Sequence, residues 1–178
     1  MHPRTIELCN YLAVQHSNLR AAFDAIPPER RSRRPSPDQW SPADVIGHLA
    51  ILESRVADIF STLISEARAR GLRAEPDTSP VLPTIDVTRV LDRSTKFVAP
   101  DRVDPRKTPT CLAWSDYERA HDQLTAIVRQ TDGLALADVM YPHPIFGSLN
   151  LYEWIAFTGA HAARHTEQIR ESAGVPTP

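Results

Sequence analysis

The sequence predicts an all-α protein, a four-helix bundle with a long connection between its second and third helices. Sixteen prolines stand against six glycines in the 178 residues, and the prolines cluster in two stretches. Because proline interrupts helices, the long segments between these clusters are the expected helices. Each segment repeats apolar residues at helical spacing, and we find no strand alternation of useful length. The connection is long enough to cross the bundle, so helices two and three are expected to run parallel.

The first two helices have recognisable limits. The first is expected over residues 3–26. The second follows Ser41, which can cap it, with Pro42 at the first helical position, Asp44 in a capping box and Gly71 at the end. The inward residues are spaced three or four apart: Ile6, Cys9, Leu12, Ala13, Leu19 and Phe23 in the first helix, and Val45, Leu49, Leu52, Val56, Ile59, Phe60, Leu63 and Ile64 in the second.

Proline-rich loops separate the remaining helices. Residues 72–113 form the long connection, with one short helix expected at about residues 85–97. A third long helix is expected over residues 115–131. The stretch YPHPIFGSLN is expected to be a loop that leads into the last helix, which Asn150 can cap and which covers residues 151–172.

Composition and charge narrow the class of protein. Apolar residues make up 42% and charged residues 24%, which is typical of a soluble globular protein, and the length suits one domain over residues 1–178. A net charge of −2 gives no overall attraction to nucleic acid or to a membrane. No apolar run reaches the ~20 residues of a membrane span, and the first residues lack a signal peptide's apolar segment. We therefore expect a cytoplasmic protein, with Cys9 and Cys111 as reduced thiols.

The feature that points to function is the pair His161 and His165, one helical turn apart in the stretch GAHAARHTEQIRE. Both are expected on the stripe of the last helix that faces the bundle, and His48 on the inward stripe of the second helix. Burying an imidazole without a partner costs on the order of 1–3 kcal/mol. Three imidazoles can remove that cost by binding one metal ion, because neutral imidazole is a good ligand of zinc, copper, iron and nickel.

Two interpretations of these histidines stay open on the residues alone. Three protein ligands leave a position for water or substrate, which is the arrangement of catalytic metal sites. The spacing H-x-x-x-H also occurs in many helices that bind no metal. An enzyme and a non-catalytic bundle, in which the histidines hold a structural metal or only hydrogen bonds, are therefore both retained.

Two longer stretches resemble the DinB/YfiT-like family of bacterial four-helix-bundle proteins, the damage-inducible family. The stretch QWSPADVIGHLAILES is similar to the family's tryptophan-containing loop and the following helix, which bears a metal-ligand histidine. The stretch YPHPIFGSLNLYEWIAFTGAHAARHTEQI is similar to its final part, with a His-Pro loop, a capped helix and H-x-x-x-H followed by Gln-Ile. The order and spacing of the two stretches agree as well.

The resemblance implies an up-down-down-up bundle and a divalent metal, commonly nickel or zinc, held by His48, His161 and His165. Several relatives use such a site to activate low-molecular-weight thiols, and others are suspected hydrolases. We therefore expect a metal-dependent enzyme of the thiol S-transferase or isomerase type that acts on a small molecule. A hydrolase that activates water and a non-catalytic metal-binding bundle are the alternatives. Residues 72–113 are longer and richer in proline than the family leads us to expect, so the substrate is left open.

Other polar side chains are expected to have mainly structural roles. We assign Asp44 to capping and Glu53 to a solvated position, although either could orient a ligand imidazole. Tyr141 and His143 are expected as a packed tyrosine and a turn histidine, with acid–base catalysis as the alternative. His121 is expected between two inward residues of the third long helix, where it could be an additional ligand.

The remaining features concern the surface and the bundle ends. Trp40 is expected to cover the bundle end and Trp154 to face inward, and either could line a pocket. The basic stretch RRSRR is expected to be a solvated loop, with nucleic-acid binding as the less favoured alternative. Ile51 and Phe157 are expected away from the seam between the helices, and relatives are often homodimers, so we expect a homodimer.

Overall fold

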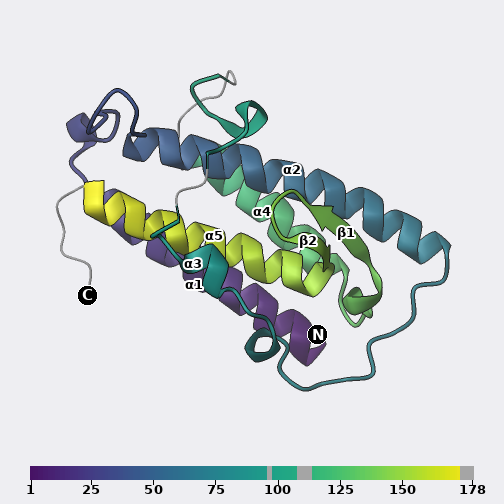
Figure 1. Cartoon of the computed structure of the whole chain (residues 1–178). Helices are drawn as coiled ribbons and strands as arrows, with labels where there is room; N and C mark the ends of the chain where they lie inside the picture. Colours follow the sequence, from purple (N-terminus) through teal and green to yellow (C-terminus); the bar gives the residue numbers. More distant parts are fainter. Residues whose placement is uncertain (96–97, 108–113, 173–178) are drawn as a thin grey trace.

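The computed structural model describes residues 1–95, 98–107 and 114–172. Phe97 and Cys111 lie outside these ranges. Four long helices pack side by side and confirm the predicted bundle (Figure 1): α1 (Pro3–Asp24), α2 (Pro42–Ala69), α4 (Trp114–Gln130) and α5 (Leu151–Ser172).

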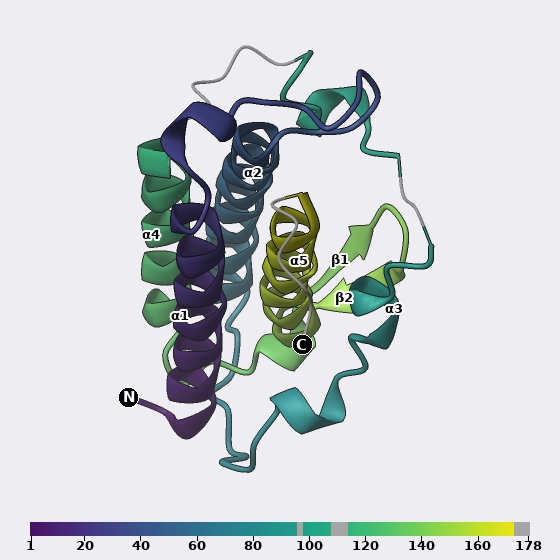
Figure 2. The ribbon, with the colours of Figure 1, turned by 90° about the vertical axis from the view of Figure 1, so that its left-hand side faces the viewer.

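The helices run in two parallel pairs, α1 with α5 and α2 with α4 (Figure 2). Ala74 and Leu134, which follow the ends of α2 and α4, form an isolated β-bridge. Near the same end, Arg68 of α2 donates a hydrogen bond to the carbonyl oxygen of Gln130 in α4. The C-terminal ends of α2 and α4 therefore lie at the same end of the bundle, so the two helices run parallel. This confirms the predicted up-down-down-up topology.

The helix starts follow the predicted capping chemistry. The Ser41 hydroxyl accepts from the Asp44 amide at 3.1 Å, and the Asp44 carboxylate accepts from the Ser41 amide at 2.9 Å. At the start of α5 the Asn150 side chain accepts from the Glu153 amide at 3.0 Å, and Glu153 accepts from the Asn150 amide at 2.8 Å. Each box satisfies amides that the first turn of a helix leaves unpaired.

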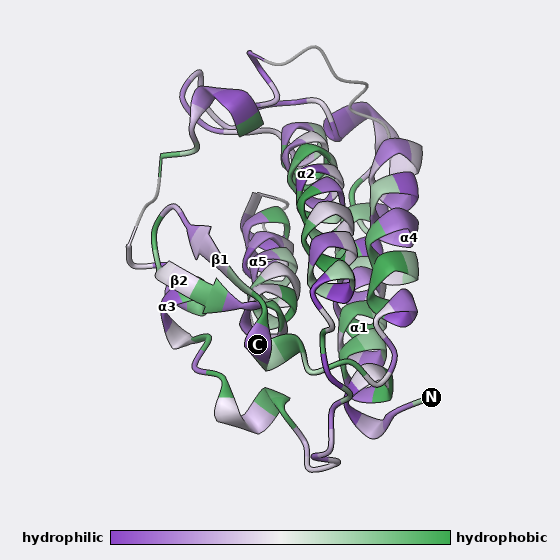
Figure 3. Cartoon of the chain, turned by 90° about the vertical axis from the view of Figure 1, so that its right-hand side faces the viewer, coloured by the Kyte–Doolittle hydropathy of each residue, from purple (hydrophilic) through white to green (hydrophobic). Residues whose placement is uncertain are grey.

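The apolar faces of the long helices meet in two clusters of buried residues. Hydrophobic and hydrophilic residues lie side by side along each of these helices (Figure 3), so that one face is available for the core. Among the helices that the structure describes, none is long and apolar enough to cross a membrane. The smaller cluster lies near the start of α2 and consists of Leu19, Ala22, Phe23, Ile26, Val45, Ile46, Leu49, Ala50, Tyr117 and Ile169.

The connection after α2 contains less helix than predicted. Instead of a helix over residues 85–97, it forms a 3-10 turn (Leu82–Thr84) and the single helical turn α3 (Thr88–Leu91), followed by a second 3-10 turn (Asp101–Val103). Side chains compete with the helix here, because Asp92 accepts from the Ser94 amide at 2.9 Å. That local bond ends the helix after one turn.

The expected loop before α5 is a β-hairpin. After a 3-10 turn (Leu136–Asp138), strand β1 (Met140–His143) pairs antiparallel with β2 (Gly147–Asn150), with His143 opposite Gly147. Gly147 has φ +81°, a left-handed conformation that suits glycine in a short hairpin loop. The prediction of no strand was wrong because strands of four residues are too short for their alternation to stand out.

Ile51 and Phe157, on which the predicted homodimer depends, are both partly buried by other residues of the chain. The ring of Phe157 packs against Phe146 in the hairpin, with centroids 5.0 Å apart, and Ile51 is half-buried. The exposed large apolar residues of the long helices are instead Ile6 and Val14 of α1, with 41% and 53% of their surface exposed. The homodimer stays a prediction.

Candidate metal centre

Two helices bring the three predicted histidines together. His161 and His165 lie on α5 one turn apart, and His48 faces them from the second turn of α2. One ring nitrogen from each imidazole lies within 4.8 Å of a ring nitrogen of the other two. In the described part of the chain, these three histidines form the group of side chains that could hold a metal ion. The inward placement predicted from the apolar stripes is therefore correct for all three.

The nitrogens that converge are the Nε2 atoms. Nε2 of His161 lies 3.1 Å from Nε2 of His165 and 3.5 Å from Nε2 of His48. His48 and His165 are buried, with 4% and 7% of their surface exposed. A single ion between these atoms would have three nitrogen ligands from two helices.

The opposite ring nitrogens of two of these histidines are held by oxygen acceptors. Nδ1 of His48 lies 2.7 Å from the carbonyl oxygen of Val103, and Nδ1 of His165 lies 2.8 Å from Oε1 of Gln168. Both acceptors place the ring hydrogen on Nδ1 and leave a lone pair on Nε2, the tautomer that a metal ligand needs. Nδ1 of His161 is buried and has no hydrogen-bond partner among the described residues.

Burial favours the neutral form of all three imidazoles. It holds the pKa of His161 well below its ordinary value, and the neighbouring His165 and His48 lower it further. Burial lowers the pKa of His165 to about 3, and it also lowers the pKa of His48 against the opposing effect of the Val103 carbonyl. Neutral imidazole is the form that binds a metal.

The arrangement of lone pairs fits a cation better than hydrogen bonds alone. With hydrogens on Nδ1 of His48 and His165, both of their Nε2 atoms are acceptors. His161 has one ring hydrogen and can donate it to only one of them, so one lone pair is left without a donor. An ion bound by all three Nε2 atoms removes this conflict, and the donor set suits a divalent transition metal.

An indole covers one side of the histidines. The ring of Trp40 lies 4.7 Å from the ring of His48 and 6.3 Å from that of His165, measured between centroids. Trp40 was predicted to cover the bundle end, and in the structure its ring packs against the histidines of the candidate site. Trp154 is buried, as predicted, and its Nε1 donates to the Tyr141 carbonyl at 3.0 Å.

His143 has a structural role in the hairpin. Its Nδ1 accepts from the amides of Ile145 at 3.1 Å and Phe146 at 3.3 Å, and its ring packs 4.7 Å from that of Trp154. Burial lowers the pKa of His143 to about 4. Its nitrogens are not in the group formed by the other three histidines. The interpretation as a turn histidine therefore agrees with its contacts.

A second polar cluster lies between α2 and α4. Glu53 accepts from the Tyr117 hydroxyl at 3.2 Å and lies 3.0 Å from Nδ1 of His121. Only 2% of the Glu53 surface is exposed, so the prediction of a solvated Glu53 was wrong. Its two partners are residues of α4, a pairing that no local spacing on α2 reveals. His121 faces the core as considered, but its partner is this carboxylate, and its ring stacks 4.5 Å from that of His16.

Asp44 has the capping role that was predicted. Besides Ser41, its carboxylate binds Arg34 through two nitrogens, at 2.8 and 3.1 Å. Within the part of the chain that the structure describes, the Asp44 carboxylate forms no hydrogen bond with either ring nitrogen of His48. The acceptors that do orient the histidines, Gln168 and the Val103 carbonyl, were missed. Gln168 follows His165 by three residues and so lies on the same helix face, which is a signal the sequence contains.

Comparison with known proteins gives this geometry a context. The family sequence model of the DinB superfamily matches residues 11–169, a segment that contains all three histidines. The chain belongs to the DinB superfamily. The resemblance noted in the sequence is confirmed by this match.

Two further proteins are similar to this chain. The uncharacterized protein YuaE of Bacillus subtilis (strain 168) is 26% identical over 147 residues, which cover 80% of this chain and 83% of YuaE. A crystal structure described as TT2238, a four-helix bundle protein, aligns with a TM-score of 0.59 and 19% identity over 94% of this chain and 98% of that one. This structural similarity supports the bundle fold.

Proposed function

We propose that this DinB-superfamily protein is a metal-dependent enzyme. In this proposal His48, His161 and His165 hold one divalent transition metal, nickel or zinc, that activates a small thiol for S-transfer or isomerisation. The observation that supports it most is the convergence of three Nε2 atoms, with Nε2 of His161 3.1 and 3.5 Å from the other two. Three protein ligands leave room for a further ligand, as in catalytic sites.

The residues around the site would each have a defined task. When bound, the metal would lower the pKa of a thiol that binds to it, so that the sulfur reacts as an anion. Gln168 and the Val103 carbonyl hold the lone pairs of His165 and His48 toward the ion. Trp40 packs against the ring of His48, and the low pKa of His165 keeps that imidazole free of competing protons.

A water-activating hydrolase is the alternative activity. Three imidazoles suit nickel and zinc alike, and such a site can present hydroxide as well as thiolate. The preference for a thiol comes from the family resemblance, since relatives use it in this way. A bundle that binds metal without catalysis is the second alternative.

The test compares metal-loaded protein with protein stripped by a chelator. An aryl halide or an epoxide is offered with a small thiol, and separately an ester or amide is offered without one. We expect turnover only where metal and thiol are both present, and none in His161→Ala. Metal-dependent hydrolysis without thiol would favour the hydrolase. Equal rates with and without metal, across several thiols, would contradict both activities.

A further inference from the structure

A pocket of about 420 Å³ opens at one end of the bundle, where α1 ends, α2 begins and α5 ends. Its walls include Ile26 after α1, Pro42 at the start of α2 and Ser172 at the end of α5. The loop that contains the RRSRR stretch forms its rim and contributes Arg30 and Arg33. The site proposed above does not use this pocket.

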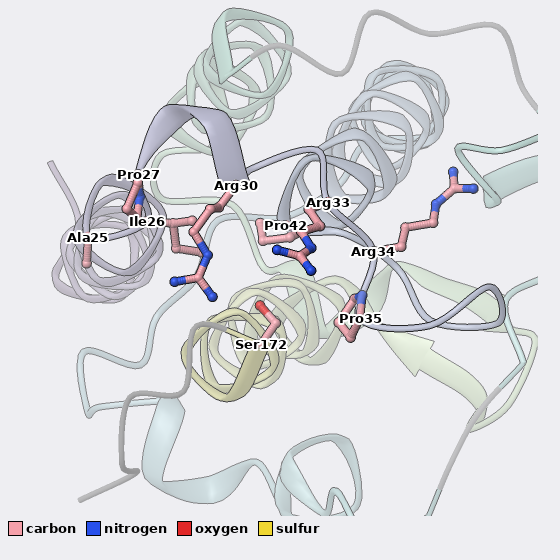
Figure 4. A pocket seen from close by; sticks show the side chains of 9 residues that line it. All are labelled: Ala25, Ile26, Pro27, Arg30, Arg33, Arg34, Pro35, Pro42 and Ser172. Carbon is pink, nitrogen blue, oxygen red and sulfur yellow. The ribbon is translucent and has the colours of Figure 1, made fainter.

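The arginines of this loop differ in what they bind. Arg31 donates to the Ile26 carbonyl at 2.9 Å and lies over the ring of Phe23. Arg34 forms the two hydrogen bonds to Asp44 described above. The guanidinium groups of Arg30 and Arg33 have no hydrogen bond or ion pair with any residue in the described part of the chain. In Figure 4 both lie over the pocket, whereas Arg34 points away from them.

The pocket is positively charged, and backbone hydrogen bonds connect its rim to α2. Three arginines line it, and its lining contains no aspartate or glutamate. The amide of Arg33 donates to the carbonyl of Arg30 at 3.0 Å, so one turn presents both side chains. The turn is tied to α2, since the Ala43 amide donates to the Arg31 carbonyl at 2.9 Å. Guanidinium groups presented side by side suit carboxylate and phosphate oxygens.

The pocket lies near the three histidines. Pro42 precedes His48 by six residues on α2, and Ser172 follows His165 by seven on α5. At the rise of an α-helix these separations are about 9 Å and about 10.5 Å along the helix axes. A molecule of metabolite size is long enough to cover such a distance.

We infer that Arg30 and Arg33 bind the anionic group, phosphate or carboxylate, of a small molecule, and that this molecule is a substrate of the histidine site. The inference that the two arginines bind an anion depends only on the pocket. The inference that the bound molecule is a substrate rests on the proposed function. The RRSRR stretch, expected to be a solvated loop, would then supply the recognition of the substrate's charge.

The first experiment measures binding to the full chain without metal. Inorganic phosphate and succinate are titrated separately at constant ionic strength into the parent, Arg30→Gln/Arg33→Gln and the control Arg55→Gln/Arg70→Gln. Arg55 and Arg70 are exposed residues of the α2 region, so the control removes the same charge elsewhere. Thermal unfolding of each variant verifies its fold.

We expect saturable binding of at least one probe, weakened about tenfold or more in the pocket variant and by less than about twofold in the control. The probe that binds identifies phosphate or carboxylate as the preferred group. No saturable binding of either probe, or an equal loss in both double variants, would overturn the pocket assignment.

The second experiment uses metal-loaded enzyme and two thiols of similar size, one anionic and one neutral. We expect Arg30→Gln/Arg33→Gln to raise KM about tenfold for the anionic thiol, with kcat unchanged and with the neutral thiol unaffected. Equal changes for both thiols would overturn the link to the substrate. If the loaded enzyme has no activity at all, the proposed function fails, and the metal-free titration still decides the pocket.

Discussion

Nδ1 of His48 lies 2.7 Å from the carbonyl oxygen of Val103, a residue 55 positions further along the chain. Val103 belongs to the connection between the second and third long helices, which the sequence shows only as a proline-rich segment. The connection thus contributes directly to the candidate metal centre, because its carbonyl sets the tautomer and orientation of one imidazole. Gln168 has the same relationship to His165 within α5.

Removing the Gln168 acceptor is expected to weaken metal binding. Gln168→Ala leaves Nδ1 of His165 without its partner at 2.8 Å, and the loss of such a partner costs about 10- to 100-fold in metal affinity. Gln168→Glu keeps an oxygen acceptor and should retain most of the affinity. Competition with a chromophoric chelator measures both, with Gln123→Ala on α4 as the control. Unchanged affinity in Gln168→Ala would show that this contact has no part in metal binding.

Gly159 is expected to be required by Tyr11. A Cβ atom at position 159 would lie 2.3 Å from Cε1 of Tyr11, so in Gly159→Ala the Tyr11 ring or the two helices must shift. We expect a loss of about 1–3 kcal/mol in the free energy of unfolding. In a Tyr11→Ala background the same substitution should instead stabilise by up to about 1 kcal/mol, because alanine favours helix over glycine. Denaturant unfolding of the four proteins measures this, and destabilisation by the same amount in both backgrounds would contradict it.

The stability of the protein is expected to fall in acid partly through His143. Its pKa is lowered to about 4 by burial, from an ordinary value of 6.5. Below pH 6.5 the unfolded chain therefore binds a proton at this position that the folded protein does not. This contribution to stability is complete above pH 6.5 and is lost as the pH falls toward 4.

The variant His143→Asn isolates this effect. The asparagine oxygen can accept the amide of Ile145 in place of Nδ1, but it does not titrate. Unfolding is followed by urea at several pH values in chelator-treated protein. We expect a shallower fall of stability in the variant between pH 6.5 and 4. Parallel curves would show that His143 titrates alike in the folded and unfolded chain.

The cluster of Glu53 and His121 is expected to support the fold and not the metal. His121→Ala removes the partner at 3.0 Å from Oε2 of the buried Glu53, while the Tyr117 hydroxyl still contacts Oε1, and it should destabilise the protein by about 1–3 kcal/mol. A double-mutant cycle with Glu53→Gln should give a coupling energy of about 0.5–3 kcal/mol. Metal affinity should stay within about twofold of the parent. A large loss of affinity in His121→Ala would assign His121 a role at the metal.

The parts of the fold that local chemistry determines were predictable from sequence. Ser41, Pro42 and Asp44 fix the start of α2, and the apolar stripes place His48, His161 and His165 on facing sides. The missed features depend on contacts between distant segments. Glu53 is buried because Tyr117 and His121 of another helix meet it. The hairpin is too short for its alternation to be read.

The central claim is that the three histidines hold one metal ion, and metal content tests it most directly. Protein purified without an affinity tag is analysed for bound metal and then titrated with nickel and zinc, beside His161→Ala, His165→Ala and the control His143→Ala. We expect close to one ion per parent chain, retained in the control and lost from tight binding in both ligand variants, because each removes one of three converging nitrogens. A ligand variant that binds the metal as tightly as the parent would contradict the claim.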